Sequence, residues 1–275
     1  MTAIRDQTLV IDDEPAGDGR NPRLLVTNDD GIESPGIHSL ARRLAADFDV
    51  IVVAPREDMS GTGTALGRFD PEVGVQMRTH SLDGVDRAYS VDGPPGLAVL
   101  ASALGAFGRK PDMVVSGVNA GLNTGHSVLH SGTVGAALTA RSLGMCGLAV
   151  SLDHSEPWRW DEAAEVAASA ASWLIEHGPG AVLNINVPGR PLWEVKGATW
   201  ADLDAFGHIR LATANVPGEI LEFEVRTAST GEDPLSDTAL CRQGFVTATL
   251  LESIEPAPTP AHSAADIWAP APSER

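Results

Sequence analysis

The chain has 275 residues, of which 43% are apolar and 20% are charged, so it can bury the core of one large domain. Asp and Glu total 37 against 19 Lys and Arg, and the resulting formal charge of −18 argues against a nucleic-acid polymer as partner. The longest uncharged run, residues 113–140, is rich in Gly, Asn, Ser and Thr, so neither a membrane-spanning segment nor a membrane partner is expected.

Both ends of the chain are predicted to be tails. Residues 1–22 are polar and acidic without the apolar core of a secretory signal, and residues 255–275 are rich in Pro and Ala. Residues 23–254 are therefore expected to form a single domain. The two cysteines, Cys146 and Cys241, suit a reducing compartment better than a disulfide framework, so a cytoplasmic location is expected.

Short apolar strands alternate with helical patterns from residue 23 onward. A strand at 23–27, a helix at 35–46 and a strand at 50–54 form a β-α-β unit, with Ser34 as cap and Pro35 in the first helical turn. Further strands are predicted at 87–91, 112–116, 148–152 and 181–187, and further helices at 97–107, 133–143 and 158–177. This order predicts an α/β fold with a mostly parallel sheet covered on both faces.

The alternation ends after residue 188. Two runs of β character remain, at 220–225 and 245–250, and they are expected to belong to a hairpin extension within residues 189–250. Such a hairpin has little core of its own and gains by pairing with a second copy. A homo-oligomer is therefore expected, a dimer by default, with a tetramer left open.

Unusual polar residues follow the predicted strands. In an open parallel sheet, ligands bind at the carboxyl ends of the strands, so these loops are the places to search for a site. Asp29 and Asp30 directly follow the first strand, Ser60 lies after the second, and Asn119 lies after the strand at 112–116. Adjacent carboxylates are costly to bury unless a cation compensates them, and an all-oxygen ligand set favours one Mg²⁺ or Mn²⁺ ion. A turn with a helix-capping carboxylate is the alternative.

A second group of residues predicts an anion site. Glycines at 117, 121 and 125 precede Ser131, Gly132 and Thr133, which begin a predicted helix. Glycines allow close backbone approach, and a helix N-terminus with hydroxyl side chains offers donors to a phosphate. The alternative is that Ser131 only caps the helix.

These motifs resemble the SurE family, the survival-protein-E nucleotidases. The resemblance covers nearly the whole domain and is carried by 24–31 (LLVTNDDG), 35–37 (PGI), 52–55 (VVAP), 60–61 (SG), 116–125 (SGVNAGLNTG), 131–134 (SGTV), 183–188 (LNINVP) and, more weakly, 237–250. It implies a Rossmann-like three-layer core with a C-terminal hairpin, and a metal-dependent phosphomonoesterase acting on nucleoside monophosphates.

The resemblance also implies roles for single residues. The metal ligands fall on the four residues found at the strand ends: Asp29, Asp30, Ser60 and Asn119. Asn123, Ser131 and Thr133 match positions that line the phosphate site, with Gly132 between the last two.

Several residues depart from the family pattern around the substrate. His126 stands where an acidic residue is usual, and His130 replaces a Tyr. Gly93–Leu97 differs from the usual Gly-Thr-Pro-x-Asp, and Thr64 and Gly67 stand where Asn and Thr are usual. A related small phosphate ester is therefore an alternative substrate to a nucleotide.

The mechanism expected is attack on phosphorus by metal-activated water, with Asp29, Asp30 and Asn119 as the catalytic residues. Asn123, Ser131 and Thr133 would donate to the phosphate oxygens. Histidine exchanges protons near neutrality, so His126 or His130 is a hypothetical general acid, against the alternative of ordinary loop histidines.

Three other enzyme classes fit less well. A phosphatase of the haloacid-dehalogenase type needs carboxylates two positions apart, but Asn28 stands two before Asp30. A serine-hydrolase elbow at Ser127 would need Gly where Leu129 stands. A P-loop would need four residues between its glycines and then Lys, whereas three residues separate Gly121 and Gly125 and His126 follows. A non-catalytic nucleotide- or partner-binding protein also remains open, although the retained ligand set argues against it.

Overall fold

A computed structural model describes residues 21–68, 70, 72–177, 182–205 and 233–252, together with the backbone of 209–215 and 222–227. Residues 1–20 and 253–275, which make up nearly all of the two predicted tails, lie outside the described residues.

The elements alternate along the chain much as the sequence predicts. The strands are β1 (Arg23–Thr27), β2 (Asp49–Pro55), β3 (Met77–Leu82), β4 (Val85–Val91), β5 (Met113–Ala120), β6 (Cys146–Leu152), β7 (Val182–Val187), β8 (Ala198–Trp200), β9 (Ile209–Asn215), β10 (Glu222–Thr227) and β11 (Val246–Leu251). The α-helices are α1 (Pro35–Leu44), α2 (Pro95–Ala103), α3 (Gly132–Ser142), α4 (Trp160–His177) and α5 (Asp237–Gln243), and the 3-10 helices are η1 (Gly125–His130) and η2 (Leu192–Glu194).

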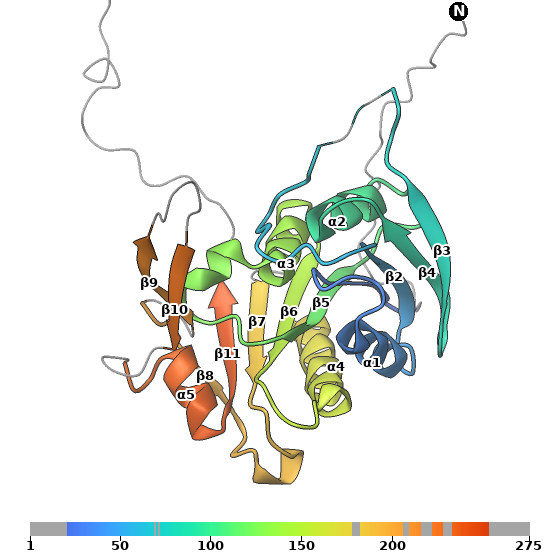
Figure 1. Ribbon diagram of the computed structural model, residues 1–275. Coiled ribbons are helices and arrows are strands. Elements are labelled where there is room, and N and C mark those ends of the chain that lie inside the picture. The colour runs from blue at the N-terminus through green and yellow to red at the C-terminus, as the bar shows by residue number, and fades with distance from the viewer. Residues whose placement is uncertain are drawn as a thin grey trace, which may run out of the picture.

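The main sheet is mixed but mostly parallel. Its order is β3-β4-β2-β1-β5-β6-β7-β11-β8, and the six strands from β4 to β7 run parallel (Figure 1). β3 is antiparallel to β4, and β11 is antiparallel to β7. The predicted α/β fold is confirmed.

Helices cover both faces of this sheet. Leu24 and Val26 of β1 pack in one apolar cluster with residues of α1 and α4, whereas Leu25 packs in a second cluster with residues of α2 and α3. Because both faces of the strand are buried, β1 reads in the sequence as a continuous apolar run.

The expectation that residues 245–250 belong to a hairpin extension is wrong. The hairpin is formed by β9 and β10, which pair antiparallel as a separate two-stranded sheet. β11 instead joins the main sheet between β7 and β8. Its Val246, Thr247 and Leu251 side chains are buried, which suits a strand inside a covered sheet better than an exposed hairpin.

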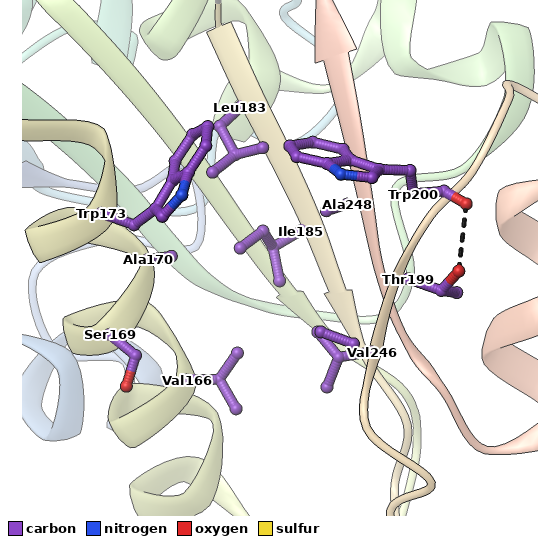
Figure 2. A pocket seen from close by; sticks show the side chains of 11 residues that line it. Val166, Ser169, Ala170, Trp173, Leu183, Ile185, Thr199, Trp200, Val246 and Ala248 are labelled. Atoms are coloured by element: carbon purple, nitrogen blue, oxygen red, sulfur yellow. Dashed lines mark hydrogen bonds between the residues drawn. The ribbon is translucent and has the colours of Figure 1, made fainter. Parts of the chain in front are cut away.

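An apolar groove of about 330 Å³ lies between α4 and the β7-β11-β8 end of the sheet. Figure 2 shows Trp173 of α4 and Trp200 of β8 on its two walls, with Leu183 and Ile185 of β7 between them. The two indole rings meet edge to face with centroids 5.8 Å apart.

Two further expectations concern the cysteines and the membrane. Cys146 and Cys241 are both buried and unpaired, so neither is part of a disulfide. Among the helices of the described ranges, none has both the length and the apolar character needed to cross a bilayer.

Candidate active site

The candidate site lies where the strand order reverses. β1 is central, and the chain places β2 and β4 on one side of it before returning to place β5 on the other. The loops after β1 and β5 therefore diverge, and in open α/β sheets the crevice outside the carboxyl ends of the strands at such a point is the usual ligand position. Asp29 and Asp30 follow β1, and Asn119 lies at the end of β5, so the fold brings these residues to that crevice.

Thr133 connects two of the predicted metal ligands. Its hydroxyl donates a hydrogen bond to Asp29 Oδ1 and lies 3.3 Å from Asn119 Oδ1. Asp29 is only 3% exposed. A Cβ on Gly132 would lie 2.8 Å from Asp29 Oδ2, so this glycine allows the first turn of α3 to approach the carboxylate.

Burial makes both carboxylates hard to ionise. It raises the pKa of Asp29, although hydrogen bonds from the Thr133 side chain and from the backbone amides of Thr133 and Gly132 oppose that rise. The pKa of Asp30 is raised to about 6, first by burial and then by the negative charge of Asp29, while the Ala120 amide opposes the rise. A cation between the carboxylates would reverse this balance by stabilising their charged forms.

A β-bulge in β5 sets the position of the Asn119 side chain. Ser116 of β5 pairs with Ala149 of β6, but Asn119 pairs with Ser151, so two β5 residues face one on β6. Gly117 within the bulge has φ +136°, a conformation that favours glycine. The side-chain nitrogen Nδ2 of Asn119 donates to the Gly121 carbonyl at 2.7 Å, which leaves the side-chain oxygen Oδ1 on the side of Thr133.

The loop with Ser60 is tied to the same edge. The Met59 backbone amide donates to the Asp29 backbone carbonyl at 2.7 Å. The Ser60 hydroxyl donates to Asp58 Oδ1 at 2.6 Å, and its amide donates to the same oxygen at 2.7 Å. Because the hydroxyl hydrogen is directed to Asp58, the oxygen lone pairs remain available to a cation. The sequence reasoning did not single out Asp58.

The donor set fits a hard divalent cation. Its members are carboxylate oxygens of Asp29 and Asp30, the hydroxyl of Ser60 and the amide oxygen of Asn119. Within the described ranges, no three His, Cys, Asp or Glu side chains gather as a metal-binding group. A cation at this edge would therefore need the neutral oxygens of Ser60 and Asn119 in addition to the two carboxylates.

Ser131 caps α3. Its Oγ accepts a hydrogen bond from the Val134 amide at 3.1 Å, so the capping interpretation describes its contact in this structure. The cap uses an oxygen lone pair and leaves the hydroxyl hydrogen available to an anion. The capping role and the predicted phosphate contact are therefore compatible.

The remaining predicted residues lie on the segment that leads to Ser131. The Asn123 side chain donates to Ser151 Oγ at 2.9 Å and so is directed toward β6. His126 and His130 are exposed on η1. The His130 carbonyl accepts from the Gly63 amide at 3.2 Å, which joins η1 to the loop that follows Ser60.

The sequence reasoning missed a buried carboxylate behind this segment. Asp237 of α5 accepts hydrogen bonds from the amides of Gly125 and Asp204, each at 2.9 Å. Burial raises its pKa, and the same backbone hydrogen bonds oppose that rise. The signal available in the sequence was Ser236 followed by Gly244, residue types that begin and end short helices, and the structure shows them as the N-cap and the left-handed C-cap of α5.

Comparison with known proteins connects this geometry with a family. The family model described as "Survival protein SurE" matches residues 24–206, which include every predicted site residue. The chain belongs to the SurE family. The resemblance carried by the sequence motifs is thus confirmed.

Relatives of the SurE family match most of the chain. The 5'-nucleotidase SurE of Pseudomonas entomophila is 36% identical over 240 residues, covering 84% of this chain and 92% of that protein. The 5'/3'-nucleotidase SurE of Escherichia coli O1:K1 / APEC is 41% identical over 177 residues, covering 64% and 67%. The crystal structure of the SurE protein from Aquifex aeolicus superposes with a TM-score of 0.70 at 30% identity, covering 84% and 93%.

Proposed function

We propose that this SurE-family protein is a phosphoric monoester hydrolase that releases phosphate from nucleoside monophosphates, with one Mg²⁺ or Mn²⁺ ion as cofactor. The observation that carries the proposal is the contact of one hydroxyl, that of Thr133, with both Asp29 and Asn119 at the start of α3. Candidate metal ligands and candidate phosphate donors thus share one point of the crevice. The relatives named 5'-nucleotidase and 5'/3'-nucleotidase support the choice of a nucleotide.

Asp29, Asp30, Ser60 and Asn119 would hold the ion. When bound, it would neutralise charge on the phosphate oxygens and lower the pKa of the attacking water. Thr133 would keep the carboxylate of Asp29 oriented, and Asp58 would keep the hydroxyl hydrogen of Ser60 turned away from the ion.

The first turn of α3 would bind the phosphate. The Ser131 hydroxyl, at the helix N-terminus, and the side-chain amide of Asn123 would be donors to its oxygens. The amides of Gly132 and Thr133 hydrogen-bond Asp29, so they would bind the phosphate only indirectly, by orienting that carboxylate. In the reaction, the water oxygen forms a bond to phosphorus, the ester P–O bond breaks, and the leaving alkoxide takes up a proton. We propose direct attack by water, because Asp29 and Asp30 are assigned to the ion and Asp58 accepts the Ser60 hydrogen bonds.

His126 and His130 are the candidates for donating that proton, since both are exposed on η1 just before Ser131. His126→Ala and His130→Ala are the test. A lower turnover number with an altered basic limb of the pH profile in one variant would identify the acid. Unchanged turnover and unchanged profiles in both variants would exclude the two histidines.

The proposed function is tested by phosphate release from a panel of nucleotides, sugar phosphates and other small monoesters, with and without divalent ions. Wild type is compared with Asp29→Asn, and Asp83→Asn, which changes an exposed carboxyl group on the β3–β4 turn, is the matched control. Binding of Mn²⁺ is followed independently by its paramagnetic resonance signal. We expect Asp29→Asn to lose both Mn²⁺ binding and phosphate release, and Asp83→Asn to keep both.

Three outcomes of the panel decide against parts of the proposal. Equal rates for wild type and Asp29→Asn would refute the metal site. Preference for a sugar phosphate would keep the hydrolase but reject the nucleotide substrate. Absence of release from every ester, despite Mn²⁺ binding, would favour a non-catalytic binding protein.

We also propose a homo-oligomer, either a dimer or a tetramer. β9 and β10 form a two-stranded sheet separate from the main sheet, and a lone two-stranded sheet is marginally stable in water. Sedimentation equilibrium measures the assembly, and a purely monomeric protein at micromolar concentration would refute this proposal.

A further inference from the structure

Asn123 is held by the side chain of a buried asparagine on β7. Asn186 Oδ1 accepts a hydrogen bond from the Asn123 amide at 2.8 Å, and Asn186 Nδ2 donates to the Asn123 carbonyl at 2.9 Å. Asn186 has no exposed surface. One side chain thus fixes both backbone polar groups of Asn123.

Two more buried side chains complete the contact. Asn184 Nδ2 donates to the same Asn123 carbonyl at 2.9 Å, and Ser151 Oγ on β6 accepts from Asn123 Nδ2 at 2.9 Å. Both Asn184 and Ser151 are fully buried. The backbone N–H, the backbone C=O and the side-chain amide of Asn123 are therefore all held by residues of the sheet.

This arrangement is costly for the fold. β7 places Leu183 and Ile185 against the apolar cluster shared with α1 and α4, but its intervening side chains on the opposite face are asparagines. A buried asparagine loses its hydration, and apolar residues would pack the same space without that loss. Asn184 Oδ1 has no partner within the described structure, so part of the loss is uncompensated.

The next two residues of the segment are also held. Thr238 donates from its hydroxyl to the Thr124 hydroxyl at 2.8 Å, and Asp237 accepts from the Gly125 amide at 2.9 Å. Residues 123–125 are thus fixed one after another. They connect Asn119, a proposed metal ligand, with η1 and Ser131.

The side chain of Asn123 keeps donor capacity beyond its hydrogen bond to Ser151. A carboxamide nitrogen carries two hydrogens, and Ser151 accepts only one of them. Asn123 itself is partly exposed, unlike the three side chains that hold it. Fixing the amide through Ser151 therefore also fixes the direction of its second hydrogen.

We propose that Ser151, Asn184 and Asn186 are positioning residues that act through Asn123, holding its side-chain amide ready to donate to a phosphate oxygen. The inference rests on the proposed function, because it needs a phosphate in the crevice. None of the three touches the reacting atoms, and each acts only by orienting Asn123. Preorganised donors of this kind contribute to catalysis because they need no reorientation when charge develops.

A double-mutant cycle separates positioning from general stabilisation. Ser151→Ala, Asn123→Ala and their combination are compared with wild type, using AMP with Mn²⁺ and inorganic phosphate as product inhibitor. Thr247→Val is the matched control: Thr247 pairs with Asn186 across β7 and β11, is fully buried, and its hydroxyl has no partner in the described structure. Urea unfolding of each variant measures stability separately.

We expect Ser151→Ala to lower kcat/KM about tenfold and to weaken inhibition by phosphate by a similar factor. In the Asn123→Ala background, Ser151→Ala should cause no further loss, because the residue through which it acts has gone. Thr247→Val should match wild type in both kinetic measurements.

Losses that multiply in the double variant, or a Ser151→Ala enzyme equal to wild type, would overturn the inference. Asn186→Asp provides a second route: it keeps the acceptor for the Asn123 amide but lacks the donor to the carbonyl, and the same non-additivity is expected of it. If wild type releases no phosphate from AMP or any other ester, the proposed function itself has failed. Additive losses in an active enzyme refute only the positioning role.

Discussion

Replacing Asp30 by Asn should stabilise the metal-free protein. Burial and the charge of Asp29 raise the Asp30 pKa from 3.8 to about 6, so above pH 6 the folded protein holds a carboxylate that its surroundings disfavour. A rise of that size corresponds to about 3 kcal/mol of differential stability. Because the side chain is partly exposed and water screens it, we expect a gain of about 1–2 kcal/mol in the free energy of unfolding.

The sign of the pH dependence follows from the same rise. Between the pKa of the unfolded chain and that of the folded protein, the folded state holds a proton that the unfolded state has released. The Asp30 contribution therefore makes metal-free wild type less stable as pH rises from about 4 to about 6. Asp30→Asn lacks this contribution, so the two proteins should differ little at the acidic end and most above pH 6.

The assay is urea unfolding in chelator across this pH range, followed by circular dichroism, with Asp83→Asn as the exposed-carboxyl control. Addition of Mn²⁺ should then stabilise wild type by about 3 kcal/mol at a hundredfold excess over its dissociation constant, and leave Asp30→Asn nearly unchanged. An Asp30→Asn protein that is no more stable than wild type in chelator above pH 6 would refute the argument from burial and like charge.

Two other substitutions test the geometry. Thr133→Val keeps the shape but removes the hydroxyl that contacts Asp29 and Asn119, and should lower kcat about 100-fold with the fold intact by circular dichroism; a loss below threefold would contradict the assigned role. Gly135→Ala places a Cβ about 2.1 Å from the Gly63 carbonyl oxygen, so α3 and the loop after Ser60 must move apart. We expect it to cost about 1–3 kcal/mol of stability, measured by thermal unfolding, and to weaken Mn²⁺ binding, measured by titration. Unchanged Mn²⁺ affinity would show that the loop after Ser60 does not contribute to the metal site.

The central strands and their helices could be predicted because local pattern and burial agree there. β1 is predicted with its observed limits, since its burial on both faces gives an unbroken apolar run. β3 was missed because it is an edge strand with mostly exposed polar residues such as Arg78 and Thr79, so it carries no apolar alternation. The pairing of β11 with β7 is a long-range contact, and nothing in residues 246–251 alone distinguishes it from a hairpin strand.

The residues of the candidate site likewise fall into those that the sequence predicts and those that it does not. Asp29, Asp30 and Asn119 could be found because polar residues directly after buried strands are unusual and because strand ends share one edge. The supporting residues could not be found by that rule. Ser151 and Asp237 contact residues 123 and 125, which are far from them in the sequence, and Asp58 lies within a turn rather than at a strand end. Asn184 and Asn186 did carry a signal, since two asparagines inside an apolar strand need partners when buried.

The overall charge predicts an unusual dependence on salt. A protein with a formal charge of −18 repels a phosphate dianion at long range, so attraction to the substrate depends on groups inside the crevice. Salt screens the long-range repulsion over about 10 Å at 0.1 M but screens contacts in the crevice much less.

At fixed free Mn²⁺, kcat/KM for AMP should therefore rise about two- to fivefold as KCl increases from about 20 to 200 mM, with kcat nearly constant. The neutral nucleoside, used as a competitive inhibitor, should show no such change. A fall in kcat/KM over this range would mean that the field at the mouth of the crevice is positive despite the acidic surface, and that cations near the site dominate capture of the substrate.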